Sequence, residues 1–343
     1  MTMRRISRGS ATALIAALLL SLWTALGGSA QEATPNPYTP PANAGDLSGK
    51  IIADGSSTVG PVTEAVAEEF NAVAPNVEVE VNISGTGGGF KRFCAGETDI
   101  QDASRPIKAE EDEACRQAGV NYYVFEVAYD GLSIVVNPAN DFVECLTVDQ
   151  LKRLWEANST VDSWNDLNPD WPDKPVSLYG PGTDSGTYDY FVEAIIGKDG
   201  STRTDYTPSE DDNVLVEGVA GDENALGFFG FAYYEQNQDR LKLVAVDGGD
   251  GCVMPSKETV RDLSYKPLSR PLYVYVKAES LTRPEVQEFM RFYLANAMEL
   301  VDDVGYVDSP VDVYVRDQQK LEAAIAGAAE PDGPAAPAAT PAA

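Results

Sequence analysis

Histidine is absent from this sequence of 343 residues. Without an imidazole, the chain cannot form Ser-His-Asp or Cys-His catalytic groups, or a histidine-ligated zinc or copper centre. Basic residues are also scarce: 25 lysines and arginines stand against 54 aspartates and glutamates, which gives a net charge of −29. Nucleic acids and anionic lipid surfaces both bind proteins through basic patches. We therefore expect neither as a partner.

The sequence has a single long apolar run, and it lies near the N-terminus, over residues 11–26. Three arginines precede it and small residues follow it at 28–30. This order is typical of a secretory signal peptide cleaved before Gln31, with an uncleaved anchor helix as the alternative. No cysteine follows directly, so a lipobox is missing. We predict a signal peptide over 1–30 and an exported protein, in the periplasm or outside the cell at its surface.

The chain has four cysteines, Cys94, Cys115, Cys145 and Cys252. An even number in an exported protein favours two disulfides, with buried free thiols as the alternative. No two of them form a C-x-x-C pair, so we expect no zinc or redox site. Three connectivities are possible, and we prefer the nearest-neighbour pairing, Cys94–Cys115 and Cys145–Cys252.

Both ends of the mature chain have compositions typical of flexible segments. Residues 31–46 are rich in Pro, Ala, Thr and Asn, and the C-terminal residues are mainly Ala, Pro, Gly and Thr. Such segments bury too little apolar surface to offset the entropy of ordering. We predict a linker over 31–46 and a disordered Pro/Ala tail over 321–343. Since 43% of the chain is hydrophobic, the body between them can bury a substantial core.

Strand and helix patterns alternate through this body. Short apolar or alternating segments predict strands at 50–53, 77–83, 122–127, 132–136 and 176–179. Helical spacing follows several of them, as at 61–71. This alternation predicts an open α/β sheet, a fold in which ligands bind beyond the carboxyl ends of the strands.

Three of the strand-to-helix turns share small residues, hydroxyls and glycine. They are Ser56-Ser57-Thr58, Ser84-Gly85-Thr86-Gly87 and Asp184-Ser185-Gly186-Thr187. A helix N-terminus offers unpaired N–H groups to an anion, and glycine lets the anion approach the backbone. Arg105 stands nearby in sequence, and its guanidinium could hold phosphate or sulfate. The alternative is that these hydroxyls are ordinary N-caps and Arg105 a surface ion pair.

The turn at 184–187 also matches the D-[ST]-G-[ST] motif of aspartic proteases. Those enzymes need two carboxylates that share a proton, hence two copies of the motif. This sequence has one copy. We therefore expect a binding protein and not an enzyme, and keep an acid aspartic protease as the alternative from another class.

Taken in order, the motifs resemble the phosphate-binding protein of bacterial ABC-type phosphate uptake systems. They are DGSSTVGPVTEAVAEEF (54–70), ISGTGGGFKRFCAGETDI (83–100), ASRPI (103–107), GTDSGTYDYFVEAI (182–195), NALGFFGFAYY (224–234), PSKETV (255–260) and PLSRPLYVYV (267–276). The resemblance covers about 50–320. It implies a two-lobed periplasmic-binding-protein fold of type II, with the ligand in the cleft between two α/β domains joined by a hinge. We assign 47–128 plus 256–320 to lobe 1 and 129–255 to lobe 2.

The resemblance also implies a function: high-affinity binding of inorganic phosphate outside the cytoplasmic membrane, and delivery to the permease of an ABC transporter. Another tetrahedral oxyanion such as sulfate is the alternative ligand. We expect a monomer that needs no cofactor and no metal. The ligand residues that the resemblance implies are Ser57, Thr58, Val59, Thr86, Gly87, Ser104, Arg105, Ser185, Gly186 and Thr187.

Two positions depart from the family pattern. Pro181 stands where other members have an arginine, and Arg105 stands where they have an aspartate. That aspartate matters, because a carboxylate accepts a hydrogen bond from the proton of monohydrogen phosphate and repels sulfate, which has no proton to donate. Asp184 is our first candidate for the missing carboxylate, followed by Asp54 and Asp102. Arg270, in the PLSRP stretch, is the next candidate cation if Arg105 is a structural ion pair.

Overall fold

The computed structural model describes residues 35–183, 185–197 and 200–333. The expected signal peptide over 1–30 lies outside these ranges, as does Asp184. Within them, no helix is long and apolar enough to cross a membrane.

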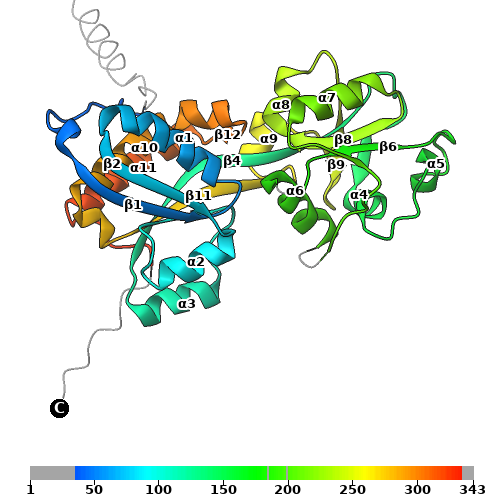
Figure 1. Ribbon diagram of the computed structural model, residues 1–343. Coiled ribbons are helices and arrows are strands. Elements are labelled where there is room, and N and C mark those ends of the chain that lie inside the picture. Colours follow the sequence, from blue (N-terminus) through cyan, green and yellow to red (C-terminus); the bar gives the residue numbers. More distant parts are fainter. Residues whose placement is uncertain (1–34, 184, 198–199, 334–343) are drawn as a thin grey trace, which may run out of the picture. The chain divides into compact units, whose positions relative to one another are not determined.

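Strands and helices alternate in the first part of the described chain. The elements are η1 (Ala44–Asp46), β1 (Ser48–Gly55), α1 (Gly60–Val73), β2 (Asn76–Ile83), α2 (Thr86–Cys94), β3 (Ile100–Ala103) and α3 (Ala109–Ala118). β1 pairs in parallel with both β2 and β3. The carboxyl ends of these three strands therefore lie along one edge of the sheet, and each is followed by a turn into a helix (Figure 1).

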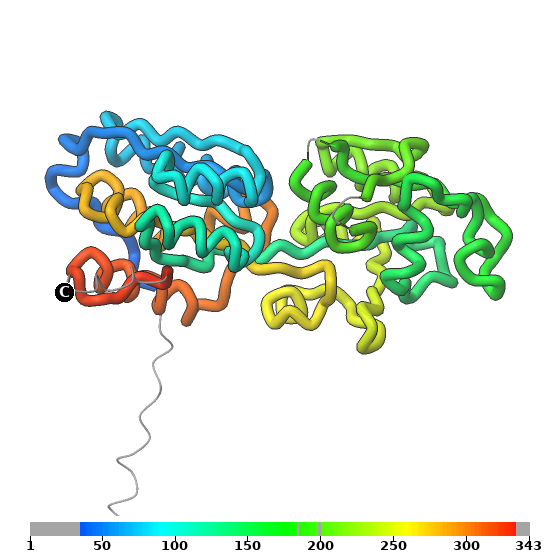
Figure 2. The backbone as a smooth tube through the Cα atoms, turned by 90° about the horizontal axis from the view of Figure 1, so that it is seen from below, coloured from blue at the N-terminus to red at the C-terminus, as the bar shows by residue number. Residues whose placement is uncertain are grey.

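A long strand, β4 (Tyr122–Val136), continues this sheet into a second one. Its first half pairs with β11 (Ser269–Lys277) and its second half with β8 (Ala225–Gly230) and β9 (Lys242–Asp247), all antiparallel. Two separate strands were predicted here, at 122–127 and 132–136, whereas the structure has one. The chain passes from the first group of elements to the second along β4 and returns along β11 (Figure 2).

The remaining elements follow the same mixed pattern. Between β4 and β11 the chain forms β5 (Cys145–Thr147), α4 (Val148–Trp155), α5 (Trp164–Leu167), β6 (Ser177–Gly180), α6 (Gly186–Phe191), the π-helical turn η2 (Val192–Ile196), β7 (Thr207–Pro208), α7 (Asp212–Gly221), α8 (Phe231–Gln236), β10 (Cys252–Val253) and α9 (Lys257–Arg261). After β11 come η3 (Ser280–Thr282), α10 (Pro284–Val304), β12 (Val307–Asp308) and α11 (Val311–Ile325). β6 pairs in parallel with β8 and β7. The predicted α/β class is confirmed.

Two large buried clusters form the hydrophobic core. In the first, α1, α10 and α11 cover one face of the sheet around Phe70 and Tyr293. On the other face of this sheet, α2 and α3 cover a smaller, separate cluster (Figure 1). The second cluster surrounds Trp155 and Phe228. It begins on β4 at Tyr129 and also contains Val260, Tyr265 and Leu268. Residues 256–268, assigned to lobe 1 from the sequence, therefore pack against the second cluster.

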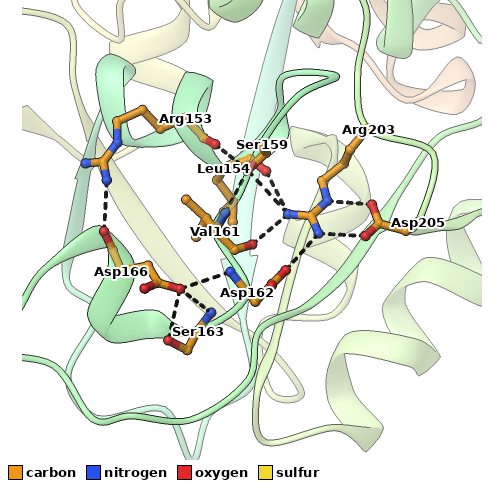
Figure 3. A network of polar contacts seen from close by, with 9 residues as sticks. All are labelled: Arg153, Leu154, Ser159, Val161, Asp162, Ser163, Asp166, Arg203 and Asp205. Carbon is orange, nitrogen blue, oxygen red and sulfur yellow. Dashed lines mark hydrogen bonds and ion pairs between the residues drawn. The ribbon is translucent and has the colours of Figure 1, made fainter.

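A buried arginine holds the loops beside the second cluster (Figure 3). The Arg203 side chain is 10% exposed. Its Nη1 donates to the carbonyl of Val161 at 2.7 Å, and Nε and Nη2 donate to the two carboxylate oxygens of Asp205 at 2.6 and 2.7 Å. One guanidinium thus satisfies a carbonyl and a carboxylate from two different loops.

The C-terminal segment differs from the tail that composition predicted. α11 runs to Ile325, past the expected boundary at 321. The hydroxyl of Tyr123 donates to the carbonyl of Ala329 at 3.0 Å, and the backbone N–H of Val124 donates to Asp332 at 2.7 Å. Residues 321–333 are thus ordered against β4. Leu321 and Ala324 are also buried in the first hydrophobic cluster, with Ile325 and Ala329 packed against it. Composition alone does not predict this, because only a few apolar side chains, together with backbone and carboxylate hydrogen bonds, hold the segment.

The segment predicted as a linker over 31–46 is also attached to the fold where it is described. Asn36 exchanges two hydrogen bonds with the Gln318 side chain, at 2.8 and 2.9 Å. The ring of Tyr38 packs edge-on against Phe292, with the ring centroids 5.2 Å apart. These contacts place the described part of the segment on α10 and α11.

Both predicted disulfides are present in the structure. Cys94–Cys115 joins α2 to α3. Cys145–Cys252 joins β5 to β10, the two strands that flank β9. The nearest-neighbour connectivity is confirmed.

Candidate functional site

The strand-to-helix turns line a cavity of about 710 Å³. Seven of the predicted ligand residues line it: Ser57, Thr58, Thr86, Gly87, Ser104, Arg105 and Gly186. They come from the turns after β1, β2 and β3 and from the start of α6. Residues as far apart in sequence as 57 and 186 therefore lie in one site.

The turn after β1 is fixed by a close approach of two strands. A Cβ on Gly55 would lie 2.1 Å from the carbonyl oxygen of Asp102, and its φ of +145° is one that residues with a side chain rarely adopt. The same carbonyl accepts a hydrogen bond from the N–H of Ser56 at 2.9 Å. The N–H of Thr58 donates to the Ser56 hydroxyl at 3.1 Å. Only glycine fits at 55, and it sets the path of the chain into α1.

The turns after β2 and β3 are joined by their hydroxyls. The Thr86 and Ser104 hydroxyls are 3.1 Å apart, and the N–H of Ser104 donates to Thr86 Oγ1 at 3.3 Å. Gly85 precedes α2 with φ +75°, again a glycine conformation. Two hydroxyl groups and the first turn of α2 are thereby placed at the cavity wall, as an anion site requires.

Gly186 brings the turn before α6 against the turn after β1. A Cβ at this position would lie 2.9 Å from Thr58 Oγ1 and 3.0 Å from the Thr58 nitrogen. Any side chain larger than hydrogen would push the two turns apart. The absence of a side chain at 186 is therefore a requirement of the site.

Three predicted ligand residues do not line the cavity. Val59 is fully buried. Ser185 acts as the N-cap of α6, with its hydroxyl accepting from the N–H of Thr187 at 3.1 Å. This is the N-cap alternative that the sequence left open.

The predicted carboxylates have other partners or are not described. Asp184 lies outside the described residues. Asp54 is buried and paired with Arg92, and it accepts from the N–H of Ser84 at 3.1 Å. Asp102 is buried beneath the turn, where the Thr63 hydroxyl donates to it at 2.9 Å. Neither Asp54 nor Asp102 lines the cavity.

Arg105 lines the cavity but is already paired. Its Nη1 and Nη2 donate to the two carboxylate oxygens of Glu111, both at 2.8 Å. Burial opposes ionisation of Glu111, but hydrogen bonds from Arg105 and from the N–H of Lys108 outweigh it and hold the pKa of that carboxyl below its ordinary value. Arg105 therefore lines the cavity, as predicted for a phosphate-binding cation, and also forms an ion pair, as the alternative predicted.

Arg270, on β11, is a second arginine in the cavity wall. Its Nε and Nη2 donate to Asp130 Oδ2 on β4 at 3.1 and 3.0 Å, and Nη2 also donates to Thr58 Oγ1 at 2.8 Å. Its guanidinium carbon lies 3.6 Å from the ring centroid of Tyr190, on α6. Asp130 is buried, which raises the pKa of its carboxyl, while Arg270 opposes that shift.

The charge of the cavity wall differs from that of the whole chain. Four cations line it, Lys91, Arg105, Lys108 and Arg270. Four carboxylates line it as well, Glu110, Glu111, Asp189 and Glu193. The described wall therefore carries no net formal charge, whereas the chain carries −29. Against so acidic a background, this balance favours an anion here over elsewhere on the surface.

No cluster of carboxylates or cysteines in the described ranges has a geometry that would hold a metal ion. The chemistry available in the wall is hydrogen-bond donation from hydroxyls, backbone N–H groups and guanidinium groups. Such donors bind an oxyanion.

Comparison with known proteins agrees with this geometry. The model of the PBP superfamily domain matches residues 39–297. Protein SphX of Synechocystis is 49% identical over 77% of this chain and 80% of its own length. The phosphate-binding protein PstS of Staphylococcus saprophyticus is 41% identical over 82% of this chain and 87% of its own. The chain belongs to this family of phosphate-binding proteins.

Solved structures of family members share the fold. The crystal structure of a possible phosphate-binding protein from Planctomyces limnophilus is 47% identical and superposes with a TM-score of 0.78, over 81% of this chain and 99% of that one. A Clostridium perfringens protein, assigned as the substrate-binding protein of a phosphate ABC transporter and solved with bound phosphate, is 31% identical, with a TM-score of 0.53 over 76% of this chain and all of that one. The fold is the type II periplasmic-binding-protein fold expected from the sequence.

Proposed function

We propose that this protein binds inorganic phosphate outside the cytoplasmic membrane and delivers it to the permease of an ABC transporter. The observation that carries the proposal is the cavity in which the hydroxyls of three strand-to-helix turns meet two arginines. Membership of the phosphate-binding family supports the same ligand. The protein acts as a carrier, so binding and release, rather than bond cleavage, are its activity.

Discrimination against sulfate requires a carboxylate that faces the ligand. We keep Asp184 as the first candidate because of its place beside the turn at 185–187. Asp189 is the second, since it lines the cavity. Burial raises the pKa of the Asp189 carboxyl, and the charge of Arg270 opposes this shift. An ionised carboxylate at either position would accept a hydrogen bond from the hydroxyl of monohydrogen phosphate.

Calorimetric titration of phosphate-stripped protein tests the proposal. We expect saturable binding of phosphate and at least about a hundredfold weaker binding of sulfate, because one repelling carboxylate in a desolvated site costs several kcal/mol. In Asp184→Asn or Asp189→Asn, whichever carboxylate faces the ligand, phosphate should bind more weakly and sulfate more tightly.

Two results would contradict this function. Equal affinities for the two anions would favour a general oxyanion carrier. Proteolysis of a gelatin zymogram at low pH, lost in Asp184→Asn, would favour the acid protease that the sequence left as an alternative.

A further inference from the structure

We infer that Arg270, rather than Arg105, is the arginine that holds the phosphate. Arg270 takes the role of the arginine that other family members have in lobe 2, at the position of Pro181 in this chain. This inference rests on the proposed function. It assigns the main charge contact of the site to a residue on β11, outside the turns that make up the rest of the wall.

Arg270 lies where three parts of the site converge. Asp130 on β4 fixes the position of the guanidinium from behind, and the Thr58 hydroxyl holds it beside the turn after β1. On its flat face, Tyr190 of α6 lies 3.6 Å from the guanidinium carbon. A planar cation held at two edges and one face has little freedom left to lose when an anion binds.

The guanidinium still has donors to offer. The guanidinium has five N–H groups. Those on Nε and Nη2 donate to Asp130 and Thr58, which leaves the two on Nη1. Among the described residues, Nη1 of Arg270 has no hydrogen-bond acceptor within reach, and the side chain is 13% exposed at the cavity. Two N–H groups on this nitrogen therefore remain without a partner among the described residues, on a side chain that lines the cavity, and an oxyanion there could accept them.

Arg105 lacks this arrangement. Both of its terminal nitrogens donate to Glu111, and Nη1 also reaches the carbonyl of Pro106 at 3.1 Å. Glu111 itself lines the cavity, so an anion near Arg105 also meets a carboxylate. Asp130, by contrast, is 1% exposed and does not line the cavity. Of the Arg270–Asp130 pair, only the arginine lines the cavity, whereas both Arg105 and Glu111 line it.

The test compares variants by phosphate titration and thermal unfolding. Arg270→Ala alone would leave Asp130 buried and unpaired, so the main variant is the double change Arg270→Met with Asp130→Asn, which removes both charges. We expect it to stay folded and to bind phosphate at least about a hundredfold more weakly. Arg270→Lys keeps the charge but not the planar fork, and should lose about tenfold or more.

Two control variants separate binding from stability. Arg203→Ala removes an arginine as buried as Arg270, 10% against 13% exposed, from a network outside the cavity (Figure 3). It should lower the melting temperature and leave the phosphate affinity within about threefold, a difference below 1 kcal/mol. Arg105→Ala should weaken binding by less than the double variant does.

The inference is overturned if the folded double variant, or folded Arg270→Lys, binds phosphate within about threefold of the parent. It is also overturned if Arg105→Ala proves the more damaging change. In both cases the parent still binds phosphate, so the proposed function stands. If the parent shows no phosphate binding, the proposed function itself is wrong.

Discussion

At the scale of single residues, Asp102 is the carboxyl group whose ionisation the fold most clearly resists. The Thr63 hydroxyl donates to its Oδ1 at 2.9 Å and also lies 3.1 Å from the Tyr293 hydroxyl. Its other oxygen is buried with no hydrogen-bond partner in the part of the chain that the structure describes. Burial, reinforced by the charges of Asp54 and Glu64, raises its pKa to about 7 against the hydrogen bond from Thr63.

This shift predicts how stability changes with pH. Below the unfolded pKa of 3.8, both states hold the proton; between 3.8 and about 7, only the folded state does. The stabilisation from Asp102 is therefore fully present below pH 3.8. It falls by about 1.4 kcal/mol per pH unit between pH 3.8 and about 7, and is lost once the pH has risen through about 7. Asp102→Asn imitates the protonated form. It should gain stability over the parent as the pH rises toward 7 and keep that gain above it.

Urea unfolding of both proteins between pH 4 and pH 8 measures this difference. Because the two proteins share every other titrating group, subtracting their unfolding free energies isolates residue 102. A difference that stays constant across this range would mean that the folded protein holds Asp102 ionised throughout.

The sequence predicted the polar turns at residue level but not the pairing of the arginines. The hydroxyl and glycine pattern is local, and Ser57, Thr86 and Ser104 line the cavity as expected. The partner of Arg270 is Asp130, 140 residues away, and only the register of β11 against β4 brings them together. Nothing local marks such a pair, so the sequence alone favours Arg105, which stands nearer the turns.

At the scale of elements, the two disulfides close loops of very different length. Cys94–Cys115 spans 21 residues and Cys145–Cys252 spans 107. By loop-closure entropy, the first should stabilise the fold by about 3 kcal/mol and the second by about 5 kcal/mol. Replacing both cysteines of a pair with serine should therefore lower the unfolding free energy more for Cys145–Cys252.

Guanidinium unfolding of the two double-serine variants checks this order, with the parent in reducing buffer as the control that lacks both bridges. The reverse order would show that the contacts between α2 and α3 depend on their bridge for more than chain entropy. Equal losses would imply residual structure in the long unfolded loop.

Element boundaries were harder to predict where tertiary contacts override local signals. Asp130 and Gly131 resemble a break between two strands, yet β4 runs through them without interruption. Asp130 is tolerated in the strand because Arg270 pairs with it. Position 131 has no room for a side chain, because a Cβ there would lie 2.7 Å from the Val260 side chain. Both reasons come from residues more than a hundred positions away.

At the scale of the whole molecule, charge sets how fast the ligand arrives. The chain carries −29, so monohydrogen phosphate is repelled at a distance and attracted only by the donors of the cavity. Raising the ionic strength from 0.01 to 0.15 M shortens the screening length from about 30 Å to about 8 Å. We expect the association rate constant to rise with salt.

Stopped-flow measurement of phosphate binding in increasing sodium chloride tests this expectation. The dissociation rate constant is the internal control, since contacts inside the cavity are screened much less than the outer surface. An association rate that falls with salt would mean that Lys91 and Lys108 steer the anion despite the net charge.

The continuity of β4 has a consequence for how the protein unfolds. The strand contributes Phe125 and Val127 to one hydrophobic cluster and Leu132 and Ile134 to the other. Melting either cluster would expose half of a strand whose other half is still hydrogen-bonded. We therefore expect the two parts to unfold as a single cooperative unit, with one calorimetric transition, and neither part to fold when it is cut out on its own.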